Sequence, residues 1–172
     1  MTDDAILELL RSRAESLPSI YHGTPKLNPV ATLQDIESAE GELGLCFPTL
    51  LKRIYLEVAN GGYALGPSYG ILGLPRSLDN NDDQNVVKTT LELRDCEWFY
   101  GSIVICVWGC CMKSCIDCTD DDFPIYRFDG NYVGDSYLDD DPPDDAWNSE
   151  SDTLAEWLLI PNFYTKYNRT EP

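Results

Sequence analysis

The chain has 172 residues and a formal net charge of −18, and 43% of its residues are hydrophobic, among them four Trp, ten Tyr and five Phe. This length suits one domain, and the apolar content favours a folded core over a disordered chain. No apolar run approaches the roughly 18 residues that a membrane-spanning helix needs. The acidic N-terminus, MTDDAILELL, lacks the basic and apolar order of a signal peptide, so a cytoplasmic protein is expected.

The negative charge is concentrated in one part of the chain. Between Asp117 and Asp152 the sequence holds thirteen acidic side chains and one base, Arg127, a net charge of −12. Such a field repels nucleic acid and anionic lipid, whereas it attracts basic proteins and speeds their encounter. A solvated acidic face without a partner is the alternative interpretation.

Apolar residues at helical spacing predict three helices early in the chain: residues 2–16, residues 32–43 and a segment that begins near Pro48. Prolines and glycines between the first two helices indicate a linker. Thr2 and Thr32 are candidate caps. The apolar stripe of the first helix comprises Ile6, Leu7, Leu9 and Leu10. The buried side of the third comprises Leu50, Leu51, Ile54, Tyr55 and Val58, and Asn60, Gly61 and Gly62 are expected to end it.

After residue 62 the pattern becomes that of β-strands. The predicted strands are residues 69–74, 102–109, 114–119 and 123–130. A helix over 82–95, a polar loop over 139–147 and a closing helix over 151–160 complete the prediction. Helices followed by a strand meander and a last helix indicate an α+β fold with a mostly antiparallel sheet.

Four of the seven cysteines lie close together, at Cys110, Cys111, Cys115 and Cys118. The separations resemble one zinc knuckle, but a structural zinc site normally takes two knuckles from separate segments. In a strand over 114–119, Cys115 and Cys118 would point to opposite faces, because their separation is odd. Burial of the sulfurs as small core residues is therefore preferred, with a metal site or a redox pair as the alternatives.

Nothing in the sequence predicts catalysis. His22 is the one imidazole, and it precedes the expected core. There is no glycine-rich phosphate loop, and residues 139–150 have Pro and Asp where a calcium loop needs a ligand and Gly. We expect a non-enzymatic protein without catalytic residues, cofactor or metal.

Three segments, taken together, point to a known family. They are IESAEGELGLCFPTLLKRIYLEVANGG (36–62), VWGCC (107–111) and TLAEWLL (153–159). Their order and spacing resemble the SUKH superfamily, which contains Smi/Knr-type cell-wall regulators and bacterial toxin-immunity proteins. The residues that carry the resemblance are Gly44, Pro48, Tyr55, Asn60, Gly61, Gly62, Trp108, Gly109, Cys110 and Trp157. The chain departs from the family pattern where Cys111, Cys115 and Cys118 replace a glycine-rich stretch.

The resemblance implies a helical layer packed on a central sheet, no catalytic centre, and a protein that binds another protein. It implies a SUKH-like domain over 32–160, flanked by an N-terminal helix and Pro-rich extension over 1–31 and a C-terminal tail over 161–172. Bacterial relatives of this kind neutralise toxins, whereas eukaryotic ones look like regulatory scaffolds.

The acidic segments are the candidate partner-binding site: Asp120, Asp121, Asp122, Asp139, Asp140, Asp141, Asp144, Asp145 and, among them, Trp147. Trp147 is either an anchor for a basic partner or a side chain that pins its loop. The favoured function is neutralisation of a basic toxin, with a nuclease as the natural target, and without binding to nucleic acid or membrane. A regulatory scaffold for an endogenous partner is the alternative, and a protein that responds to metal or redox state through Cys110–Cys118 is the second alternative.

Overall fold

The computed structural model describes residues 1–17, 20–21, 24–67, 69–75, 84–94, 99–132 and 146–160. The α-helices are α1 (Asp3–Glu15), α2 (Leu33–Leu43), α3 (Thr49–Glu57), α4 (Val86–Leu93) and α5 (Leu154–Leu159). The strands are β1 (Ile20–Tyr21), β2 (Thr24–Pro25), β3 (Ser102–Gly109), β4 (Met112–Asp117), β5 (Ile125–Asp129) and β6 (Trp147–Ser151). Short 3-10 helices are η1 (Tyr63–Leu65) and η3 (Gly130–Tyr132). This arrangement confirms the predicted α+β fold.

Capping side chains and a glycine set the ends of α1 and α2. Thr2 caps α1 by accepting a hydrogen bond from the Ala5 amide. Thr32 and Asp35 form a reciprocal capping box at α2, in which the Thr32 amide donates to Asp35 Oδ2 at 2.7 Å. Gly44 then ends α2 with a φ of 62°, a conformation that glycine adopts without strain.

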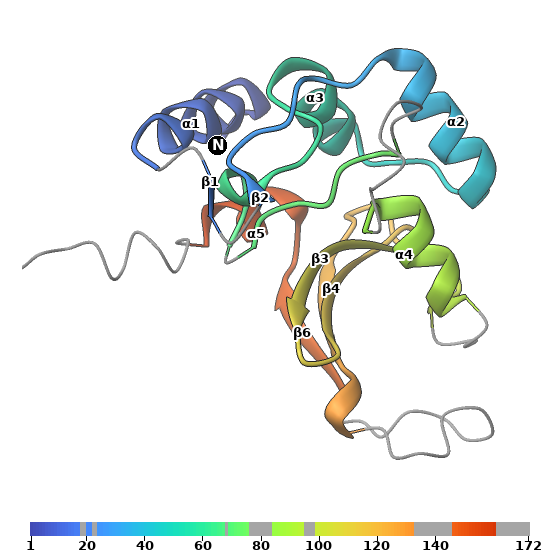
Figure 1. The fold of residues 1–172 in the computed structure, drawn as a ribbon. Coiled ribbons are helices and arrows are strands. Elements are labelled where there is room, and N and C mark those ends of the chain that lie inside the picture. Colours follow the sequence, from blue (N-terminus) through green and yellow to red (C-terminus); the bar gives the residue numbers. More distant parts are fainter. Residues whose placement is uncertain are drawn as a thin grey trace, which may run out of the picture.

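Helices α1, α2 and α3 lie together above the four-stranded sheet, and α4 lies beside its edge strand β3 (Figure 1). Their buried side chains share one core with inward residues of the sheet, such as Ile105 and Ile116. The core includes Ile6, Leu7 and Leu10 of α1, so the N-terminal helix packs onto the rest of the molecule. Leu9, predicted to be buried with them, is 37% exposed, because the apolar stripe of α1 is narrower than the run of leucines.

The sheet is an antiparallel meander in the order β3-β4-β5-β6. β3 has the predicted bounds, whereas β4 begins two residues before the predicted start and ends at Asp117. β6 was missed, because its sequence, WNSES, has almost no apolar residues, and Trp147 lies in this strand rather than in a loop. β6 pairs with β5, with Phe128 opposite Trp147, and this pairing satisfies its backbone hydrogen-bonding groups. The composition of β6 does not predict a strand.

Three further expectations need correction. The segment 69–74 forms one isolated bridge, between Gly62 and Ile71, rather than a strand. The stretch expected to be a linker contains the antiparallel pair β1 and β2. The helix expected over 82–95 is present as the shorter α4, which Asn85 caps by accepting from the Lys88 amide.

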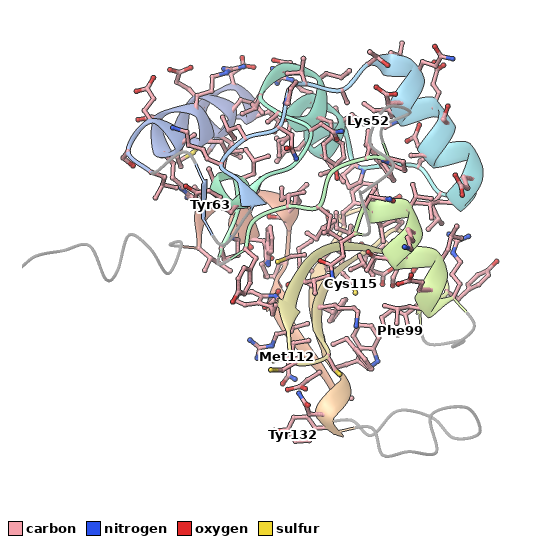
Figure 2. All side chains as sticks on the ribbon, in the orientation of Figure 1. Lys52, Tyr63, Phe99, Met112, Cys115 and Tyr132 are labelled. Atoms are coloured by element: carbon pink, nitrogen blue, oxygen red, sulfur yellow. The ribbon has the colours of Figure 1, made fainter. Side chains whose placement is uncertain are left out.

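The two faces of the sheet lie against different groups of side chains. One face joins the main core below the helices. The other face carries a smaller cluster of Phe99, Val104, Cys115, Phe128 and Ala146, with Trp147 packed against it. Figure 2 places Phe99 and Cys115 on the side of the sheet toward α4. Among the described residues, no helix is long and apolar enough to cross a membrane.

Candidate functional site

The turn between β4 and β5 presents three acidic side chains. Asp120, Asp121 and Asp122 are all exposed. The turn is held by its own backbone: the Asp122 amide donates to Asp120 Oδ1 at 2.9 Å, and the Phe123 amide donates to the Asp120 carbonyl at 3.1 Å. Phe123 has a φ of 53° and packs against the main core. The apolar ring thus anchors the turn while the three carboxylates stay in water.

The second predicted acidic group lies outside the described residues. It comprises Asp139, Asp140, Asp141, Asp144 and Asp145. The described residues on either side, Tyr132 and Ala146, lie where β5 ends and β6 begins. That end of the sheet is opposite the end that carries Asp120–Asp122, because β5 runs from one to the other. The two predicted acidic groups are separate in the sequence and can be changed in separate variants.

Trp147 packs in an aromatic cluster. Its ring centroid lies 5.1 Å from that of Phe99 and 5.1 Å from that of Phe128, and those two rings lie 4.9 Å apart in an edge-to-face arrangement. Such pairs add about 0.5–1.5 kcal/mol each to the burial of apolar area. Trp147 is half-buried, so it pins β6 to the second face of the sheet and keeps part of its surface in solvent.

A polar network on the first face of the sheet was not predicted. Glu150 Oε2 accepts from the Ser114 hydroxyl at 2.6 Å and from the Trp157 indole Nε1 at 2.9 Å. Trp108 Nε1 donates in turn to Ser114 Oγ at 2.7 Å. The Glu150 side chain is only 9% exposed. The network ties α5 to three strands, and the sequence offers no signal for it, since Glu150 sits in a polar run that looks solvated.

Arg127 completes this network on the solvent side. Its Nη1 lies 3.7 Å from Glu150 Oε1, too far for a hydrogen bond but close enough for an ion pair. Its Nε is buried and has no hydrogen-bond partner among the described residues. Arg127 is the one base between Asp117 and Asp152. It forms its ion pair with the internal carboxylate of Glu150 rather than with Asp120–Asp122.

The cysteines do not form one cluster. Cys115 is buried in the smaller cluster of the second face, whereas Cys118 is half-buried against the main core. Burial raises the pKa of Cys115 well above its usual range and that of Cys118 to about 12, so both remain thiols. Cys110 and Cys111 are exposed. Within the described residues, no three His, Cys, Asp or Glu side chains gather closely enough to hold a metal ion. Cys96 and His22 lie outside those residues.

Several residues of the family pattern lie at close backbone contacts. Asn60 is 2% exposed, and its amide group bridges Leu74 by donating to the carbonyl at 3.1 Å and accepting from the amide at 2.7 Å. A Cβ on Gly61 would lie 2.5 Å from the Gly73 nitrogen, and one on Gly62 would lie 2.5 Å from the Lys26 carbonyl oxygen. α3 already ends at Glu57, so these glycines serve chain packing beyond the helix end.

The remaining residues of the pattern take several positions. Pro48 precedes α3 as its cap, and Tyr55 is fully buried and donates its hydroxyl to the Leu72 carbonyl at 2.9 Å. Trp157 is fully buried, as expected, whereas Trp108 is only half-buried. Gly109 has a φ of 84° at the end of β3. The pattern thus marks helix ends, a close backbone crossing and the polar network.

A comparison with protein families matches residues 30–159 to the SMI1 / KNR4 family (SUKH-1). The match covers the chain from the residues before α2 to the end of α5, and the chain belongs to this family. A search of curated proteins finds no match. Membership is compatible with a role in toxin immunity and with binding to a protein partner.

Proposed function

We propose that the chain is a non-catalytic immunity protein that acts in the cytoplasm and neutralises a toxin by binding it. Family membership supports a protein partner. The observation that carries the proposal further is the net charge of −12 between Asp117 and Asp152, in a chain whose total charge is −18. A surface of this sign favours a basic partner.

The proposed mechanism has two steps. The acidic field first steers the toxin toward the chain, a contribution that salt weakens because exposed charges are screened over roughly 8 Å at physiological ionic strength. Contact with aromatic and apolar side chains then makes the complex long-lived. The exposed carboxylates of Asp120–Asp122 supply part of the field on a fixed turn. A nuclease toxin fits best, since its nucleic-acid groove is positive and an acidic surface resembles the phosphate backbone.

The partner can be captured from native lysate with four baits. These are the intact chain, a variant with Asp120, Asp121 and Asp122 changed to Asn, and a variant with Asp139, Asp140, Asp141, Asp144 and Asp145 changed to Asn. The fourth, a control, has Glu15, Glu37 and Glu42, exposed on α1 and α2, changed to Gln. We expect the intact chain and the control to retain a basic protein, and at least one Asp-to-Asn variant to lose it.

The captured protein is then expressed alone and together with the chain. Growth arrest by the partner alone, relieved by the intact chain but not by the variant that fails to bind, supports immunity. A partner that does not harm cells supports the alternative, a regulatory scaffold. The Kd of the purified complex at about 50 mM and 200 mM salt gives an independent test, because a salt-insensitive Kd would refute electrostatic capture while leaving immunity itself intact.

A further inference from the structure

The hairpin between β3 and β4 turns on two adjacent cysteines. Gly109 pairs with Met112, so the connection consists of Cys110 and Cys111 alone. Both have positive φ, 47° and 66°. A two-residue hairpin loop with positive φ at both positions is a type I′ turn, for which Asn-Gly is the favoured sequence. The chain places cysteine at both positions instead.

This choice costs backbone energy. An L-residue other than Asn, Asp or Gly is disfavoured in the left-handed region, because its Cβ approaches the following carbonyl oxygen. Strain of this kind persists where the surrounding structure enforces it and is concentrated at functional sites. The two side chains are exposed, so packing in a core does not account for them.

The backbone of the turn is held by a neighbouring element. The Asn131 side-chain amide donates to the Cys110 carbonyl at 2.6 Å, and the Gly130 amide donates to the Cys111 carbonyl at 3.2 Å. Both donors belong to η3, which follows β5. Asn131 is itself fixed, because its Nδ2 also donates to Asp129 Oδ1 at 2.7 Å. Two exposed cysteines therefore occupy adjacent positions of a braced turn. Figure 2 shows the labelled neighbours of this turn, Met112 and Tyr132, at one end of the sheet.

The turn offers two sulfurs, those of Cys110 and Cys111, and this number limits which ligands it can bind. Structural zinc takes four protein ligands, and the described residues offer no third His, Cys, Asp or Glu here. A direct disulfide between adjacent residues closes a small ring through the peptide bond, and departures from the preferred disulfide geometry store strain. A ligand atom that bonds to both sulfurs spans a wider gap. Trivalent arsenic is such an atom, since it is soft, pyramidal and satisfied by two thiolates and one further substituent.

We propose that Cys110 and Cys111 form a dithiol site for trivalent arsenic compounds. For an aryl arsenoxide the reaction consumes two S–H bonds and the arsenic–oxygen bond, and it forms two arsenic–sulfur bonds. The oxygen leaves with both thiol protons as one water molecule. Arsenic stays trivalent, so no oxidant or reductant is needed.

The probe is phenylarsine oxide, added to the purified full-length chain under reducing conditions and followed by intact-protein mass spectrometry. We expect one phenylarsenic group per chain, retained in an excess of a monothiol and removed by a dithiol. Changing either Cys110→Ser or Cys111→Ser leaves at most one As–S bond at this site. The apparent affinity should then fall by about 10²–10⁴-fold, the gain that a second linked contact gives.

Two sets of variants distinguish binding of arsenic at Cys110 and Cys111 from binding at other thiols. Cys46→Ser removes another exposed thiol, and Cys96→Ser removes one outside the described residues; both should keep the monothiol-resistant adduct. The double variant Cys110→Asn, Cys111→Gly has the sequence that a type I′ turn prefers, so it should fold and lose the adduct. The proposal is overturned if the intact chain forms no monothiol-resistant adduct, or if the double variant retains it.

Discussion

The indole Nε1 of Trp157 donates to Glu150 Oε2 at 2.9 Å and so ties the closing helix α5 to strand β6. Trp157 is a residue of the family pattern and is fully buried. The partner that keeps its N–H satisfied is a carboxylate from a strand that sequence patterning did not identify. This pair explains why a large aromatic with a polar edge can occupy the core beneath the helices, since a buried N–H without an acceptor is costly.

Changing Glu150→Gln should destabilise the fold. The carboxylate accepts from both Ser114 and Trp157 through Oε2. An amide oxygen can accept the same two hydrogen bonds, but they then lack the negative charge that strengthens them, and the Nε2 that replaces Oε1 cannot form the ion pair with Arg127. Hydrogen bonds to a charged group are worth about 1.5–3 kcal/mol and neutral ones about 0.5–1.5 kcal/mol, so we expect a loss of about 2 kcal/mol in the free energy of unfolding by urea. Glu42→Gln, on the exposed side of α2, is the matched control and should change it by less than about 0.5 kcal/mol. Equal stability of the two variants would mean that the network contributes nothing.

Gly61→Ala should also be destabilising, for a steric reason. The added Cβ would meet the Gly73 nitrogen at 2.5 Å, and the φ of 79° is strained for any residue with a side chain. Overpacking and left-handed strain together cost about 3 kcal/mol. Gly41→Ala in α2 is the opposite control: its Cβ would have nothing within 4 Å, and Ala is favoured over Gly in a helix by about 1 kcal/mol. Thermal unfolding should move Tm down for the first variant and up for the second.

The parts of the fold that sequence predicted are those with strong local signals. Caps at Thr2 and Thr32 and the β-branched run of β3 define their elements without help from distant residues. β6 depends instead on pairing with β5, and its Trp147 joins Phe99 and Phe128 only when the sheet has formed. The odd separation of Cys115 and Cys118 predicted opposite faces, and the structure places them in different clusters. No spacing rule could bring Glu150 to Ser114 and Trp157, because that contact depends on how three elements pack.

Tyr55 should make the protein less stable at alkaline pH. Burial raises the pKa of its hydroxyl far above the ordinary value, while in the unfolded chain the group ionises near pH 10. Its contribution to stability is complete below about pH 10 and is lost as the pH rises toward the folded-state pKa, because the unfolded chain then binds fewer protons. Above pH 10, Tyr55 alone should lower the free energy of unfolding by about 1.4 kcal/mol per pH unit.

Tyr55→Phe isolates this effect. The variant loses the hydrogen bond to the Leu72 carbonyl, which costs about 0.5–1.5 kcal/mol at neutral pH. Its unfolding free energy, measured in urea between pH 8 and 11, should then decline less steeply than that of the intact chain. Buried thiols such as Cys106, whose pKa burial also raises, contribute to both curves and cancel in the comparison. Parallel curves would show that Tyr55 ionises equally in the folded and unfolded chains.

The cysteine turn should be a site of stored strain that can be released by substitution. Cys110 and Cys111 both have positive φ, and Asn-Gly accepts that conformation with far less steric conflict. Left-handed backbone costs an ordinary L-residue about 1–2 kcal/mol. The free energy of unfolding by urea should therefore be about 1–2 kcal/mol higher for the double variant Cys110→Asn, Cys111→Gly than for the intact chain. Cys46→Ser, at an exposed cysteine with ordinary φ, should leave stability within about 0.5 kcal/mol. A double variant no more stable than the intact chain would show that the turn is unstrained.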